Sequence, residues 1–192
     1  LQGCGTLVKR GDAGIRVPLS PARGGTPAIA VLDPLCPACK GFDERMQASD
    51  LYRNLDLEAV LFPLDSSCNW MVKESLHPGA CAVSEAMLCA KGDAARMLDW
   101  AFRHQEELRA SAAKGDAPVR QRLEKEFPAV KGCLGSAGIR NQVNKSLRWA
   151  VANALPVLTP QLFVADRRVC DEDTDLGLEY TVARMLRAAK PS

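Results

Sequence analysis

Two cysteines separated by two residues could carry redox chemistry in this chain. The motif Cys36-Pro37-Ala38-Cys39 follows closely on a short apolar run. Thiol–disulfide exchange begins with a thiolate, whereas a free cysteine of pKa ~8.5 is mostly protonated at neutral pH. At a helix N-terminus, unpaired backbone N–H groups and the positive end of the helix dipole favour the thiolate. The motif therefore predicts an exposed, attacking Cys36 with a lowered pKa and a more buried Cys39 that resolves the mixed disulfide.

The cysteines then need a strand before them and a helix after them. Ala28–Leu32 is a continuous apolar run, which is typical of a buried strand. Pro37 suits the first turn of a helix, where its missing N–H removes no hydrogen bond. Phe42 and Met46 recur at helical spacing on one face. The sequence thus predicts strand, cysteine pair and helix in direct succession, with Cys36 at the helix N-terminus.

Further strand signals lie on both sides of a long helical segment. From Cys68 to about Leu155 the pattern is helical throughout. It contains more apolar helix faces than one small sheet can bury, so these helices are expected to pack together as a subdomain. The expected helical stripes are Met97–Leu108 after a cap at Asp93, Val119–Phe127 stopped by Pro128, Ile139–Val151, and a closing helix over Leu176–Leu186. The expected strands are Gly14–Leu19, Leu57–Leu64, and a hairpin of Gln161–Ala165 and Arg168–Cys170 that turns at Asp166-Arg167.

Composition excludes several classes of protein. The 192 residues are 47% hydrophobic and 5% aromatic, with a net charge of +2, which argues against a basic nucleic-acid-binding face and against a disordered chain. The longest stretch without acidic or basic residues, 17 residues from Trp149 to Ala165, contains two prolines. A membrane-spanning helix needs ~20 mostly apolar residues, so no spanning segment is expected. The length suits one domain, or one domain with a large insertion.

The eight cysteines of this 192-residue chain indicate the cell compartment in which it works. Apart from Cys36 and Cys39 they are scattered singly, which fits disulfides in an oxidising, extracytoplasmic environment. A competing metal set would combine that pair with Cys68, His77 and Cys81, but its spacing fits no common zinc module. Neither a metal ion nor another cofactor is therefore expected.

From about Ala28 to its C-terminus the chain resembles the thioredoxin superfamily, and more narrowly its Dsb-type members. The resemblance is carried by Cys36-Pro37-Ala38-Cys39 after one strand and Leu158-Thr159-Pro160 before another. The order of elements, with helices between the two halves of the sheet, is similar as well. Four further segments look like the branch fused to, or paired with, quinone-reducing membrane proteins of the vitamin K epoxide reductase type. They are Pro63-Leu64-Asp65, Cys68-Asn69, His77-Pro78 and Cys81.

The resemblance implies an α/β chain with a thioredoxin fold, in which a central mixed sheet is flanked by helices and an all-helical subdomain is inserted. The expected parts are 1–66 with the cysteine pair, the helical insertion 67–155, and 156–192 with a cis-proline loop. Pro160 would be that cis-proline facing the cysteines, and Thr159 and Pro160 would shape the groove for an extended substrate strand. Ala38 stands where the strongest oxidants of the family have a histidine, so a less oxidising pair is expected.

The activity implied is that of a DsbA-like thiol–disulfide oxidoreductase acting on cysteine-containing exported proteins in the bacterial periplasm. The leading form is an oxidase that is reoxidised by a quinone-linked membrane thiol oxidase, of the DsbB or vitamin K epoxide reductase type. A disulfide reductase or isomerase is the alternative, although an isomerase of this type needs an added dimerisation domain. About 25 residues before the first core strand are too few for one. A non-enzymatic thioredoxin-like binding module would ordinarily lack one of the two cysteines.

The other six cysteines allow 15 pairings. Cys81 and Cys89 would lie about 12 Å apart along one helix, too far to join each other. We favour Cys68 with Cys81 and Cys89 with Cys133, which leaves Cys4 with Cys170.

The start of the chain offers an alternative for Cys4. Leu1-Gln2-Gly3-Cys4 is similar to the end of a bacterial lipoprotein signal, in which the cysteine carries a lipid; a tail following a membrane domain is another interpretation. No initiator Met and no signal-like segment stand before it, so any export signal or membrane tether is expected outside this sequence.

The histidines and tryptophans are interpreted as structural. His77 is expected to pack or form hydrogen bonds at a helix start rather than to act as a catalyst, and His104 to be exposed on a helix. Trp70, Trp100 and Trp149 are expected in the core or in a groove wall.

Overall fold

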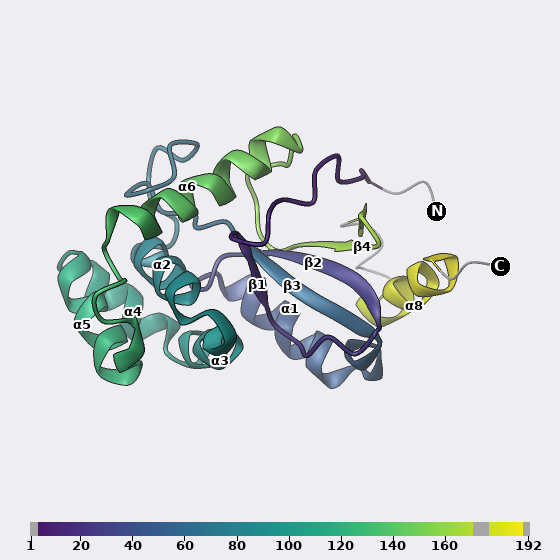
Figure 1. Ribbon diagram of the computed structural model, residues 1–192, viewed down its shortest axis with the longest axis horizontal. Coiled ribbons are helices and arrows are strands. Elements are labelled where there is room, and N and C mark those ends of the chain that lie inside the picture. Colours follow the sequence, from purple (N-terminus) through teal and green to yellow (C-terminus); the bar gives the residue numbers. More distant parts are fainter. Residues whose placement is uncertain (1–3, 171–176, 190–192) are drawn as a thin grey trace.

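The centre of the computed structural model, which describes residues 4–170 and 177–189, is a five-stranded mixed sheet (Figure 1). Its strands are β1 (Arg16–Pro18), β2 (Thr26–Leu32), β3 (Leu55–Leu61), β4 (Gln161–Val164) and β5 (Arg167–Arg168). They lie in the order β1-β3-β2-β4-β5. β2 and β3 run parallel, and the other neighbouring pairs are antiparallel. The sequence therefore predicted the kind of sheet correctly.

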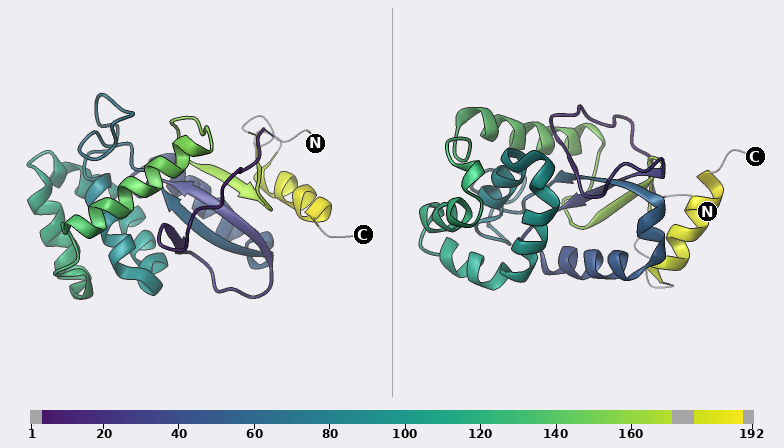
Figure 2. Two further views of the ribbon diagram at one scale, coloured as in Figure 1. Left: turned by 45° about the horizontal axis from the view of Figure 1, so that its top comes forward. Right: turned by 60° about the horizontal axis from the view of Figure 1, so that its bottom comes forward.

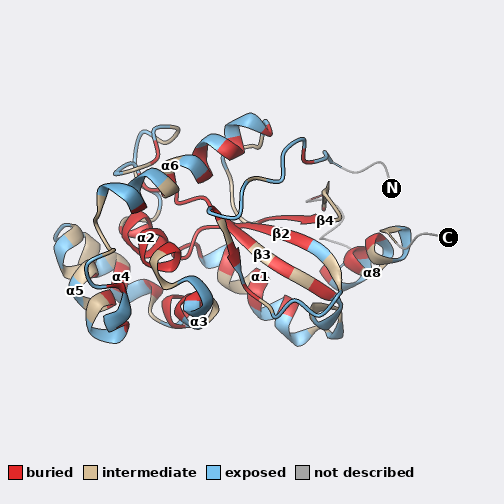
Figure 3. Ribbon diagram, in the orientation of Figure 1, coloured by how far each residue is buried: buried red, intermediate tan, exposed pale blue. Residues whose placement is uncertain are grey.

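Strand β2 is the buried centre of this sheet. β3 and β4 pair with its two sides, and its residues from Ala28 to Leu32 are all buried (Figure 3). A strand covered on both faces needs apolar side chains at successive positions, which explains the continuous run in the sequence. Leu32, the last residue of β2, pairs with Leu61, the last residue of β3, so both strands end at the same edge of the sheet. The loop with Cys36 begins at this edge. β3 begins two residues earlier and ends three residues earlier than predicted.

Helices cover both faces of the sheet. Figure 2 shows α1 (Pro37–Ala48) and α8 (Leu178–Ala189) on one face and α6 (Ala137–Ala152) on the other. Phe42 and Met46 of α1 are buried, as their spacing predicts. In the closing helix the expected stripe is buried at Leu178, Val182 and Met185, while Leu176 lies outside the described residues.

A block of helices lies between β3 and β4 in the chain, at one end of the sheet (Figure 1). It consists of α2 (Ala80–Ala90), α3 (Ala94–Arg103), α4 (Gln105–Ala112), α5 (Asp116–Glu126) and α6, with short 3-10 turns η2 (Lys91–Asp93) and η3 (Pro128–Val130); η1 (Asp50–Asn54) precedes β3. α2 is buried over nearly its whole length and contacts α3, α5 and α6. Among the described helices, none combines the length and the apolar character that a membrane crossing requires.

The segment between Cys68 and Gly79 contains no helix, so the prediction of helix from Cys68 onward is wrong there. Asp65 organises this loop instead. Its Oδ1 accepts hydrogen bonds from Ser67 N at 3.0 Å and Ser75 Oγ at 2.9 Å. Its Oδ2 accepts bonds from Gly79 N and Cys81 N, both at 3.1 Å, at the start of α2. The buried Asp65 carboxylate thus accepts hydrogen bonds from backbone N–H groups that would otherwise donate to carbonyls within a helix.

The predicted single helix over Met97–Leu108 is broken at His104 into α3 and α4. His104 Nδ1 lies 2.7 Å from Trp100 O, and its backbone leaves the helical region at φ −118°. The residue is half-buried against Trp100, so the prediction of an exposed His104 is also wrong. In α6 the ladder is buried at Ile139, Val143 and Leu147, but Val151 is 54% exposed. With 3.6 residues per turn, the buried face continues at Ala150 instead.

The hairpin turns at Ala165-Asp166, one residue earlier than predicted. Both residues have positive φ, 46° and 66°, as a two-residue turn with the hairpin's twist requires. Alanine disfavours such angles, so the sequence pointed to the following pair instead.

Three disulfides join Cys4 to Cys170, Cys68 to Cys81 and Cys89 to Cys133. Cys36 and Cys39 are free thiols. A lipid on Cys4 would occupy the sulfur that forms the bond to Cys170, so the lipid and this disulfide exclude each other. Leu1, Gln2 and Gly3 of the lipoprotein-like motif lie outside the described residues.

Candidate active site

Cys36 is the residue that caps the N-terminus of α1. Its backbone is extended, with φ −79° and ψ 121°, and Pro37 follows as the first helical residue. The Cys36 carbonyl accepts hydrogen bonds from Lys40 N at 3.2 Å and from Gln105 Nε2 at 2.9 Å. Gln105 is a buried residue of α4 and donates to Pro34 O as well, at 3.2 Å. The helical block therefore holds the loop that carries Cys36.

The loop before β4 brings Thr159 to the cysteine pair. The Thr159-Pro160 peptide is cis, and Thr159 O lies 3.8 Å from Cys36 Sγ. This approach follows from the sheet, because β4 begins at Gln161, which pairs with Val31 of β2. The Gln161 amide also donates to Pro156 O and Leu158 O, at 3.0 and 2.9 Å, and so closes the loop.

The two sulfurs differ in burial less than predicted. Cys36 is 4% exposed and Cys39 is 0% exposed, whereas Pro37 and Ala38 between them are exposed. The prediction of an exposed Cys36 is therefore wrong for this structure. The reason is tertiary, since the Thr159 loop lies against the sulfur and the Gln105 side chain holds the backbone behind it.

The ionisation of the two thiols differs strongly. Hydrogen bonding from the Cys39 side chain lowers the pKa of Cys36 to about 6; burial opposes this shift, while Thr159, the Cys39 backbone and the charge of His77 add to it. The pKa of Cys39 is raised well above its usual value by burial, and further by the hydrogen bond and charge of Cys36. Near pH 7 the pair therefore holds one thiolate, on Cys36, and one thiol, on Cys39.

The reduced protein is expected to show a thiolate absorbance transition with its midpoint near pH 6. Because Cys36 loses its proton there, the thiolate signal and the rate of alkylation should both rise as the pH increases through 6. Cys36→Ser should remove this transition, and Cys39→Ala should move it to higher pH, since Cys39 provides the largest stabilising contact. A midpoint near the ordinary cysteine value in the wild type would contradict the arrangement.

A buried carboxylate and a histidine lie beside the pair. Asp33 is 0% exposed, and its Oδ2 lies 2.7 Å from His77 Nδ1. Asp33 also accepts backbone hydrogen bonds from Leu35 N and Leu64 N, both at 2.8 Å. The expectation that His77 forms hydrogen bonds near a helix start agrees with this contact. No motif or spacing in the sequence points to Asp33 as its partner.

Two other groups of predicted residues are placed away from this chemistry. Cys68 and Cys81 are joined in a disulfide and so are not available as thiolate ligands for the competing metal set. Across the described part of the chain, no group of three ligating side chains is placed to hold a metal ion. Trp100 and Trp149 are buried, as expected, whereas Trp70 is 56% exposed on the loop after Cys68.

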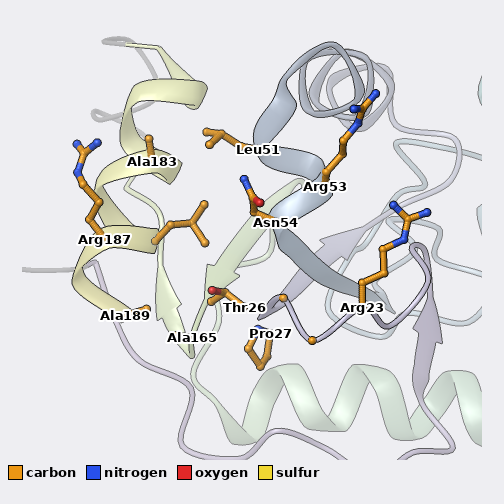
Figure 4. Close-up of a pocket in the computed structure, with 13 residues that line it drawn as sticks. Arg23, Thr26, Pro27, Leu51, Arg53, Asn54, Ala165, Ala183, Arg187 and Ala189 are labelled. Carbon is orange, nitrogen blue, oxygen red and sulfur yellow. The ribbon is translucent and has the colours of Figure 1, made fainter. Parts of the chain in front are cut away.

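A cavity of about 720 Å³ lies at the other end of the sheet (Figure 4). It is lined by the segment Arg23–Pro27, by Leu51, Arg53 and Asn54 around η1, and by one side of α8. Because β2 begins at Thr26 and Cys36 follows its opposite end, this cavity is separate from the cysteines.

Solved structures similar to this chain include Proteus mirabilis ScsC in a transitional conformation, with a TM-score of 0.58 and 16% identity over 93% of this chain and 76% of that one. The oxidoreductase DsbA of Xylella fastidiosa matches with a TM-score of 0.54 and 21% identity, over 90% of this chain and 92% of its own. A protein-disulfide isomerase of Novosphingobium aromaticivorans matches with a TM-score of 0.63 and 12% identity, over 90% of this chain and 97% of its own. No protein-family model and no curated protein matches the sequence.

These likenesses concern the fold. The chain has a thioredoxin fold with a helical insertion, as the sequence predicted.

Proposed function

We propose that this chain is a protein thiol–disulfide oxidoreductase in which Cys36 attacks and Cys39 resolves. The observation that carries the proposal is the contrast between the two sulfurs. Cys36 has its pKa lowered to about 6 at the start of α1, while Cys39, one turn further along the same helix, is held as a thiol. A nucleophile that also leaves readily, with a protonated partner behind it, is the arrangement that disulfide exchange needs.

The reaction in the oxidising direction begins with the Cys36–Cys39 disulfide. A client thiolate attacks Cys36 Sγ, the bond between the two cysteines breaks, and Cys39 leaves as a thiolate that takes up a proton. A second client thiolate then attacks the client sulfur of the mixed disulfide, and Cys36 leaves as a thiolate. The client loses two electrons and two protons; the pair gains both electrons and keeps one proton, on Cys39, near pH 7.

The oxidising direction is supported by the stability of the product thiolate. Stabilising the Cys36 thiolate stabilises the reduced pair, and this raises the reduction potential. An oxidase then needs an acceptor for the electrons that it collects. We infer a quinone-linked membrane thiol oxidase, of the DsbB or vitamin K epoxide reductase type, in keeping with the resemblance of the segments around Pro63 and His77.

The client is proposed to bind as an extended strand beside Thr159 and Pro160. The Thr159 carbonyl lies close to Cys36 Sγ, so a strand that pairs with this backbone would carry its own cysteine to the attacking sulfur. Cysteine-containing exported proteins are the substrates that fit this reaction. An extracytoplasmic site of action, such as the bacterial periplasm, fits the three disulfides of the chain itself.

The same proposal assigns roles to the parts of the chain. Residues 1–66 and 156–192 would form the thioredoxin-like part, and 67–155 the insertion. The support is that α2 to α6 all lie between β3 and β4 in the chain.

The experiment that tests the proposal measures the direction of electron flow. We expect equilibration with glutathione to give a reduction potential above roughly −200 mV, and the oxidised protein to oxidise a reduced two-cysteine peptide faster than the reduced protein reduces insulin. A Cys36→Ala/Cys39→Ala variant keeps all three structural disulfides and serves as the control that should show neither reaction. A potential near −270 mV with rapid insulin reduction would instead identify a reductase. Turnover equal to that of the control would favour a binding module.

A further inference from the structure

The two residues between the cysteines have no side chain that could stabilise the Cys36 thiolate electrostatically. Only Pro37 and Ala38 stand between the cysteines, and neither side chain carries a charge or a hydrogen-bond donor. The Cys36 thiolate therefore depends on the helix N-terminus, on Cys39 and Thr159, and on any charge brought from elsewhere in the fold.

The structure brings such a charge from the loop that follows β3. His77 Nδ1 lies 2.7 Å from Asp33 Oδ2, and the His77 side chain is only 12% exposed. The backbone N–H of His77 also donates to Leu64 O at 3.1 Å, and Leu64 N in turn donates to Asp33 Oδ2 at 2.8 Å. Side-chain and backbone contacts together hold this imidazole in one place.

Asp33 connects that imidazole to the cysteine. It lies at the end of β2, three residues before Cys36, and its carbonyl accepts a hydrogen bond from Cys36 N at 3.1 Å. The interaction is mutual, since the charge of His77 acts on Cys36 and the charge of Cys36 acts on His77. One buried residue thus holds the Cys36 backbone through its carbonyl and the ring of His77 through its carboxylate.

The groups around His77 favour its protonated form. Burial lowers the pKa of His77, but the hydrogen bond and charge of Asp33, together with the Cys36 thiolate, outweigh it, and the pKa is raised above 6.5. The positive charge of Arg109 in α4 acts in the opposite direction and lowers the pKa of His77. There is consequently a pH range in which Cys36 is already a thiolate and His77 is still an imidazolium.

We propose that His77, oriented by Asp33, is the cationic partner of the Cys36 thiolate and adds to the reactivity of the cysteine pair. This inference rests on the proposed exchange reaction and adds two positioning residues to it, neither of which lies between the two cysteines. When Cys36 leaves the mixed disulfide, the imidazolium stabilises the developing negative charge. His77 donates no proton and forms no bond to the client in this step.

The test compares His77→Gln with His104→Gln, because these are the only two histidines of the chain. Glutamine keeps a side-chain donor for Asp33 but carries no charge. With His77→Gln, we expect the alkylation rate of reduced Cys36 at pH 5 to fall about threefold, and the rate at pH 9 to stay unchanged. His104 contacts Trp100 O instead, so His104→Gln should follow the wild-type pH profile.

A second measurement uses the unmodified protein, in case the variant folds poorly. The imidazole signals of His77 and His104 can be titrated by NMR in the reduced and the oxidised protein. Because the coupling is reciprocal, His77 should titrate at higher pH in the reduced protein, where it faces a thiolate, than in the oxidised protein, where it faces a neutral disulfide.

The inference is overturned if the alkylation profile of His77→Gln matches the wild type, or if His77 titrates alike in the two redox states. In either case a Cys36 midpoint near pH 6 and turnover by the wild type would leave the proposed function standing. A wild-type Cys36 with an ordinary midpoint and no turnover would overturn the function itself.

Discussion

Cys36→Ala is expected to abolish disulfide exchange, with a fall in the rate of peptide oxidation of roughly a thousandfold or more. The physical reason is that the Cys36–Cys39 disulfide, which accepts the two electrons of the client, cannot form without Cys36. The remaining sulfur is also a poor nucleophile. Cys39 is completely buried and its pKa is raised well above the usual value, so it supplies almost no thiolate at neutral pH. The measurement is the rate at which the oxidised protein forms a disulfide in a reduced two-cysteine peptide.

Cys39→Ala is the matched variant for this prediction. It keeps the attacking thiol but removes the resolving one, so covalent complexes between Cys36 and client proteins should accumulate. Non-reducing electrophoresis followed by mass spectrometry would locate the mixed disulfide. Complexes that form through Cys39 in the Cys36→Ala variant, or no complexes through Cys36 in the Cys39→Ala variant, would contradict the assigned roles.

Removal of the Cys89–Cys133 disulfide is expected to lower the free energy of unfolding by about 4 kcal/mol, because it releases a loop of 44 residues in the unfolded chain. This bond joins the end of α2 to the segment between η3 and α6, so it ties α2 to the connection that leads from α5 to α6. Denaturant unfolding of a Cys89→Ala/Cys133→Ala variant measures the loss.

Cys68→Ala/Cys81→Ala provides the comparison. Its loop spans 13 residues, for which the same relation gives about 3 kcal/mol. Both variants should still oxidise the peptide when folded, because Cys36 and Cys39 are untouched. An unfolding free energy equal to that of the wild type would show that the loop is already restrained in the unfolded state.

Much of the local arrangement around Cys36 was predictable from the sequence. A buried strand needs a continuous apolar run, and Ala28–Leu32 supplies one. Pro37 starts a helix readily, and Phe42 and Met46 mark its buried face, so the placement of Cys36 at a helix N-terminus follows from neighbouring residues. The helix α5 was equally predictable, because Val119 and Leu123 mark its buried face and Pro128 stops it.

The predictions of helix that were wrong concern polar side chains that bind to the backbone. The loop from Cys68 to Gly79 has a helical composition, but the Asp65 carboxylate binds its backbone and holds it open. His104 ends α3 through a contact with the Trp100 carbonyl. Hydrophobic spacing reports which face is buried and carries no information about such polar contacts.

By itself, the sequence determined that this protein has a pair of cysteines one turn apart, the first at the start of a helix, because that unit is built from residues adjacent in the chain. Only the tertiary structure decided what surrounds those sulfurs. Thr159 reaches Cys36 across 123 residues and Gln105 across 69, while His77 reaches Asp33 across 44. Contacts of this range have no periodic signature; they exist because the parallel and antiparallel pairing of β2, β3 and β4 brings three separate loops to one end of the sheet.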